Sequence, residues 1–165
     1  MRDIGEYVAG DYLKYVKQCD VINHNVRTRD GGAEGQNELD VIGLDFTSKT
    51  AYLCEVATHL SGGLNYGGAT TMFTIEKVLA KHAFQKRYAD LYLTNFNEKR
   101  FMLWSPIVPV GKITAALQEK APDLELIINK RYSEAVEELK ALARQNKSFT
   151  TDPFFRFLQI MESLK

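Results

Sequence analysis

The sequence predicts a single mixed α/β domain spanning residues 1–165, in which helices cover both faces of one mixed β-sheet. The length of 165 residues suits one domain with a substantial core. A composition of 45% hydrophobic and 25% charged residues is typical of a folded globular chain. The expected order of elements is a helix, three strands, a helix, two strands and a helix. Three consecutive strands predict a meander, and the later alternation of strands with helices predicts a sheet enclosed by two helical layers.

Hydrophobic periodicity defines the elements of the first half. Apolar residues at helical spacing indicate helices, and short runs rich in β-branched and aromatic residues indicate strands. The predicted elements are a helix over 5–18, strands over 21–28, 38–43 and 52–57, and a long helix from Thr70–Thr71 to about Tyr88. A threonine at the start of that helix can cap its free amide groups.

The second half alternates short strands with helices. The predicted elements are strands over 91–93 and 100–104, an edge element over 108–111, a helix over 112–118, a strand over 124–128, and helices from Ser133 and from Asp152–Pro153. Asp-Pro favours a helix start, because proline at the first helical position has no amide to leave unpaired. The last helix is too apolar for one narrow face. It is therefore either deeply packed or in contact with a second copy of the chain, as a homodimer.

Charge and cysteine content narrow the class of protein. Lysine plus arginine and aspartate plus glutamate each number 21, which excludes a bulk polycation but not a local basic cleft. The N-terminus lacks the apolar core of a signal peptide, and no run is long enough to span a membrane. Cys19 and Cys54 have no metal-site spacing, which favours two buried, reduced thiols. We therefore expect a cytoplasmic protein without a membrane partner.

Two acids, Asp40 and Glu55, lie in consecutive predicted strands around the polar stretch 45–50. A hairpin that turns near Thr47–Ser48 places them opposite each other, with Cβ atoms roughly 5 Å apart on one face. Carboxylates held that close repel unless a cation lies between them. Because Mg²⁺ prefers oxygen ligands, the pair predicts a Mg²⁺ or Mn²⁺ site.

The segments Glu38-Leu39-Asp40-Val41-Ile42 and Leu53-Cys54-Glu55-Val56-Ala57-Thr58 resemble the motifs of the restriction-endonuclease-like superfamily, the PD-(D/E)XK nucleases, and especially its Holliday-junction-resolvase-like branch. The similarity covers roughly residues 5–105, including the α-β-β-β-α-β order. It implies a three-layer α/β/α fold and a Mg²⁺-dependent nuclease acting on DNA, with RNA as the alternative substrate. It further implies metal ligation by Asp40, Glu55 and the Val56 carbonyl, with Glu6 of the first helix as an additional acid.

The chain departs from this family at Ala57, where the motif has a lysine. In the family that lysine helps to activate water and offsets charge at the phosphate. Candidate replacements are Lys77 and Lys81, one turn apart on the long helix, and His59, which shares a strand face with Glu55. We rank Lys77 first because it is nearer the helix start.

Other interpretations of these residues stay open. Asp40 and Glu55 can be ordinary strand acids paired with lysines, the lysines a solvated helix face, and His59 a loop residue. At the level of function, the alternatives to a nuclease are a catalytically inactive module that binds nucleic acid or a protein partner, and a structural subunit that dimerises through its last helix.

Overall fold

The computed structural model describes residues 3–28, 38–66 and 70–165 and contains one five-stranded mixed sheet of order β1-β2-β3-β4-β5. The strands are β1 (Val21–Arg27), β2 (Glu38–Asp45), β3 (Thr50–Val56), β4 (Glu98–Ser105) and β5 (Leu124–Ile128). The first three strands pair antiparallel, whereas β4 and β5 are parallel to β3. This mixed sheet confirms the predicted α/β class.

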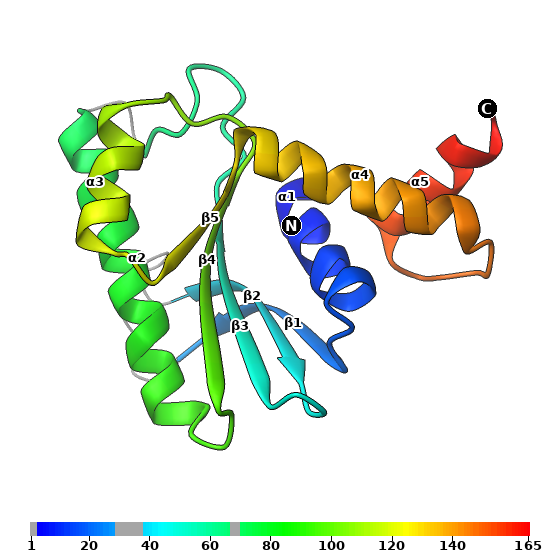
Figure 1. Cartoon of the computed structure of the whole chain (residues 1–165), viewed down its shortest axis with the longest axis horizontal. Coiled ribbons are helices and arrows are strands. Elements are labelled where there is room, and N and C mark those ends of the chain that lie inside the picture. Colours follow the sequence, from blue (N-terminus) through cyan, green and yellow to red (C-terminus); the bar gives the residue numbers. More distant parts are fainter. Residues whose placement is uncertain (1–2, 29–37, 67–69) are drawn as a thin grey trace.

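Helices cover both faces of the sheet, as Figure 1 shows. They are α1 (Ile4–Asp11), which continues into a π-helical turn η1 (Tyr12–Val16), α2 (Thr71–Tyr92), α3 (Lys112–Lys120), α4 (Asn129–Gln145) and α5 (Pro153–Ser163). One hydrophobic cluster joins α2 and α3 to the sheet, and a second joins α1, η1 and α4 to the opposite face and includes α5 residues. The two predicted helical layers are therefore present.

The β2–β3 hairpin has the predicted register. Val41 pairs with Cys54 and Asp45 pairs with Thr50, so the turn centres on Thr47 and Ser48. The Asp45 carboxylate accepts hydrogen bonds from the amides of Thr47 and Ser48, at 2.8 and 3.0 Å. An aspartate that bonds the backbone two residues ahead mimics a turn, which explains why the chain reverses here.

Two predicted strands are wrong. Residues 91–93 form the end of α2, which runs to Tyr92 without interruption and is capped at Leu93. Residues 108–111 form a loop, where the Asn129 side chain bonds both the amide and the carbonyl of Val108. In addition, α4 begins at Asn129 rather than Ser133. The Thr70 cap is as predicted, since its side-chain oxygen accepts from the Phe73 amide.

The C-terminal helix α5 packs on α1 and α4. Phe155 and Leu158 are buried there, whereas Phe157, Ile160, Met161 and Leu164 are exposed. A homodimer contact through that outer face stays a prediction. Within the described ranges, no helix is both long and apolar enough to cross a bilayer. Cys19 and Cys54 are free and buried, as predicted.

Gln85 anchors α2 to the centre of the sheet. Its side chain is 1% exposed, and its amide donates to the carbonyls of Leu53 on β3 and Met102 on β4, at 3.0 and 3.2 Å. In the sequence pattern, Gln85 lies on the same polar face of the helix as Lys77 and Lys81. In the structure, the part of this face that includes Gln85 is turned toward the sheet. These bonds fix the rotation of α2 about its axis, and with it the position of Lys81, one turn earlier.

We expect Gln85→Met to lower the free energy of unfolding by about 1–3 kcal/mol, because buried carbonyls lose their amide partner. Urea denaturation measures this change. The control is Gln118→Met, the same replacement at an exposed position of α3. Equal changes in both variants would show that the Gln85 bonds do not hold α2 in place.

Candidate functional site

Asp40 and Glu55 face each other across β2 and β3. The β2–β3 ladder ends with the pair Val41–Cys54, and Asp40 and Glu55 follow directly beyond it. The two acids share a hydrogen bond, and the Val56 amide donates to the Asp40 carboxylate at 2.7 Å. Glu55 is 5% exposed and shares its sheet face with Leu53 and Ala57, both in the cluster beneath α2 and α3. The hairpin thus brings both acids to one place inside the protein.

Glu55 has two further partners from the helical side. The Lys81 ammonium of α2 lies 3.2 Å from one Glu55 oxygen, and the Tyr66 hydroxyl donates to the other at 2.9 Å. Lys81 is itself largely buried, with 17% of its side chain exposed. Tyr66 comes from the loop between β3 and α2, so three segments meet at one carboxylate.

The charges at this site do not balance. Two carboxylates face one ammonium, so with both acids ionised the group carries one excess negative charge. Burial and the neighbouring Asp40 charge raise the pKa of Glu55 to about 8, although Lys81 and Tyr66 oppose the rise. Burial also raises the pKa of Asp40, against the opposing effects of the Val56 amide, Lys81 and a hydrogen bond with Glu55. At neutral pH the two carboxyls therefore hold a proton between them.

A third acid, Glu6, approaches the pair from α1. Its carboxylate accepts from the Asn25 side chain at 3.0 Å. The β1–β2 ladder is interrupted between the pairs His24–Val41 and Val26–Leu39, at the level of Asn25 and Asp40. Burial raises the pKa of Glu6, and the Asp40 charge adds to the rise. Glu6 therefore lies within electrostatic reach of Asp40.

The backbone changes its course at the level of Asp40. Asn25 has a left-handed backbone conformation, with φ of 52°, which asparagine tolerates better than most residues. Leu39 and Val41 would share one face of a regular strand, yet they pack in the two opposite clusters. This local twist accounts for the contact of Asp40 with groups on both sides of the sheet.

Our ranking of the replacement cation was wrong, since Lys81 and not Lys77 contacts Glu55. The Lys77 ammonium instead lies 5.5 Å from the centre of the Phe73 ring. His59 is exposed, accepts weakly from the Asn65 amide at 3.4 Å and packs edge-on against Tyr66. Its link to the acids is thus indirect, through the Tyr66 ring.

Sequence reasoning missed Tyr66 and Asn25 as parts of the site. Tyr66 follows a glycine-rich stretch of the loop, and no spacing rule relates it to Glu55. Asn25 carried a weak signal, since asparagine in the middle of a strand is unfavourable and suits a special backbone conformation.

Neither a family model nor a curated protein sequence matches the chain. Among the residues that the structure describes, no group of three or more histidine, cysteine, aspartate or glutamate side chains is arranged to hold a metal ion. The site is thus a facing pair of carboxyls, with Glu6 at its margin, Lys81 and Tyr66 on Glu55, and the Val56 backbone on Asp40.

The raised pKa of Glu55 predicts a pH-dependent stability. Between its ordinary value of 4.5 and the folded value of about 8, the folded chain holds a proton that the unfolded chain releases. The free energy of unfolding should therefore fall as pH rises through this window. The Glu55 contribution amounts to a few kcal/mol, because a tenfold change in proton affinity corresponds to about 1.4 kcal/mol.

The measurement is urea denaturation of wild type and Glu55→Gln from pH 5 to pH 9 without divalent ions. Asp11, whose pKa burial raises to about 7, gives both proteins a slope of the same sign, so the difference between the two curves reports the coupled Asp40–Glu55 pair. Parallel curves would mean that Glu55 ionises normally in the folded chain.

Proposed function

We propose that this protein is a Mg²⁺-dependent nuclease of the restriction-endonuclease-like superfamily that hydrolyses phosphodiester bonds in DNA. The observation that carries the proposal is the position of Lys81. Its ammonium contacts Glu55, the neighbour of Asp40, so α2 provides a cation to a motif that has Ala57 where the family has lysine. The order of elements and the two acids on β2 and β3 add support.

The donor set fits a hard divalent cation. The facing carboxyls provide oxygen ligands, and their excess negative charge is what a cation would neutralise. Mg²⁺ is commonly held by one or two carboxylates, with water and substrate phosphate as its remaining ligands. Asp40, Glu55 and the Val56 carbonyl would hold the ion, with Glu6 adding negative charge nearby. The bound ion would lower the pKa of a water molecule and offset charge on the phosphate.

The chain's own residues account for the rest of the proposed chemistry. A bound cation would replace the proton held by Asp40 and Glu55, so the Lys81 ammonium would no longer be their sole counter-charge. Its long apolar stem lies along the buried face of α2, which leaves the charged end at the site. There it is placed to donate to a phosphate oxygen. Tyr66 holds Glu55 in one orientation through its hydroxyl.

The alternative is a catalytically inactive module of the same fold that binds nucleic acid or a protein partner. The specific observation in its favour is the same ion pair, because a lysine committed to Glu55 has a structural role. Cleavage assays on single-stranded, duplex and branched DNA and on RNA separate the two functions.

The metal site predicts that Asp40→Asn and Glu55→Gln each abolish Mn²⁺ or Mg²⁺ binding in calorimetric titrations, while the fold survives. Removal of one acid relieves repulsion that only a proton or a cation offsets. Binding to wild type should release protons and strengthen as pH rises toward 8, because the ion displaces the proton on Glu55. Glu76→Gln, at an exposed position of α2, is the control. Unchanged binding in both site variants would place the ions elsewhere.

The cleavage role of Lys81 predicts a loss of about 10²-fold or more in Lys81→Met, a typical effect of removing one transition-state donor. Metal affinity should not weaken. Lys77→Met, one turn away, is the matched control and should retain wild-type cleavage. Adding Ala57→Lys to the Lys81→Met variant should restore part of the activity, since position 57 shares the Glu55 face. If both the wild-type chain and the Ala57→Lys variant are inert on every substrate, the inactive module is favoured.

A further inference from the structure

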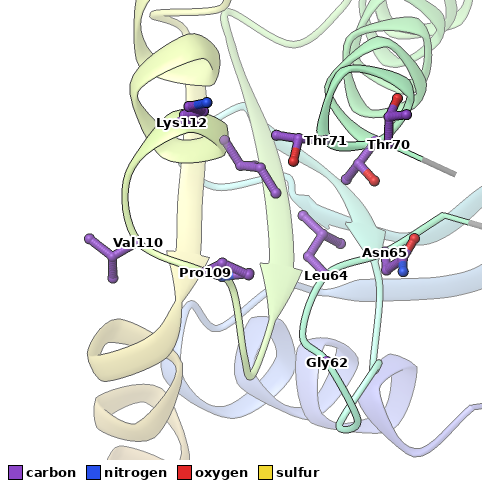
Figure 2. Close-up of a pocket in the computed structure, with 10 residues that line it drawn as sticks. Gly62, Leu64, Asn65, Thr70, Thr71, Pro109, Val110 and Lys112 are labelled. Carbon is purple, nitrogen blue, oxygen red and sulfur yellow. The ribbon is translucent and has the colours of Figure 1, made fainter. Parts of the chain in front are cut away.

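A separate cavity of about 390 Å³ lies between the loop that follows β3, the start of α2 and the start of α3. Figure 2 shows Thr70 and Thr71 of α2 above Leu64 and Asn65, with Lys112 on the α3 side. Asp40, Glu55 and Lys81 do not line it. The cavity therefore shares no lining residue with the proposed metal site.

The walls of the cavity are fixed by backbone contacts. The Leu64 amide donates to the Ile107 carbonyl at 2.8 Å and joins the two loops. Gly63 has a φ of 74°, and a Cβ there would lie 2.9 Å from Pro109 and 3.2 Å from the Ile107 carbonyl oxygen. Only glycine suits this position, so the sequence permits the close approach of the loops that shapes the cavity.

The electrostatics of the cavity favour an anion. Lys112 is the one charged residue among those that line it, and Lys112 forms no ion pair with any described residue. The N-termini of α2 and α3 both lie at the cavity, and neither helix has an acid in its first turn. Gly111, which precedes α3, provides no side-chain cap for that helix. Free amides and the positive end of the helix dipole attract negative charge.

The hydroxyl of a buried threonine is a second indication of a ligand. Thr74 lines the cavity and is 3% exposed, and within the described part of the chain its hydroxyl has no hydrogen-bond partner. This hydroxyl oxygen is not among the fully enclosed atoms without a partner, so it opens to the cavity. An oxygen-rich anion in the cavity would accept from this hydroxyl.

We propose that this cavity binds a phosphate group. A phosphate has several terminal oxygens that can accept together from the Thr74 hydroxyl, the Lys112 ammonium and helix amides. Thr74 and Lys81 lie seven residues apart on α2, about 10 Å along its axis. A nucleic-acid substrate at the proposed nuclease site could therefore place a terminal phosphate here. Inorganic phosphate or a small phosphate monoester has the same chemistry.

The test is a titration of the full chain with inorganic phosphate at constant ionic strength, followed by calorimetry and by amide NMR shifts. We expect saturable binding of one phosphate, with shifts concentrated at Thr71, Thr74 and Lys112. Lys112→Glu and Thr74→Val should each weaken binding at least tenfold. Lys120→Glu, at the other end of α3, should leave it unchanged.

Absence of saturable binding, or equal weakening by Lys112→Glu and Lys120→Glu, would overturn the proposal. Because Lys112 is exposed, its substitution leaves the fold intact, and Thr74→Val keeps the side-chain shape. A second arm compares oligonucleotides with and without a 5′-phosphate, using the Asp40→Asn variant. Preference for the phosphorylated strand identifies a nucleic-acid end as the ligand, and equal affinity identifies a small phosphate compound. Failure of metal binding or cleavage leaves the phosphate titration unaffected, so the two proposals fail separately.

Discussion

The architecture of this site depends on the burial of two facing carboxyls with one ammonium. Glu55 is almost fully enclosed, Asp40 lies opposite it, and Lys81 provides the nearest positive charge. A buried pair of like charges is unstable unless a proton or a cation compensates it. In the proposed function a metal ion would replace the shared proton. The hairpin, the rotation of α2 and the Tyr66 loop all hold the two carboxyls in place.

The helix that carries Lys81 also links the site to the cavity for which we propose phosphate binding. Its N-terminus and Thr74 line the cavity, Lys81 contacts Glu55 two turns further on, and Gln85 fixes the helix to β3 and β4. Polar residues on this one face thus meet the cavity, the acid pair and the sheet in turn. In most helices the side chains that face the sheet are apolar. On α2 this face instead carries polar residues that anchor the helix to the sheet and make the proposed ligand contacts.

The sequence predicts the acid pair well because the information is local. An aspartate-led turn and the two-residue period of strands determine which residues of a hairpin oppose each other, and both are readable at Asp45 and in the flanking strands. The choice between Lys77 and Lys81 is different, because it depends on where a 22-residue helix lies along the sheet. That position follows from the long loop before α2 and from the Gln85 bonds, which are tertiary contacts. Tyr66 escapes sequence reasoning for the same reason.

We propose that Asp40 and Glu55 form a divalent-cation site whose proton is displaced by the ion. The most direct measurement is an anomalous difference map from crystals of the wild-type chain grown with Mn²⁺. If the two acids hold the ion, the map will show a peak between the Asp40 and Glu55 carboxylates, within bonding distance of both. Two results would contradict the proposed metal site. One is ordered Mn²⁺ only at other positions, and the other is an intact Lys81–Glu55 ion pair with no peak beside it at saturating Mn²⁺.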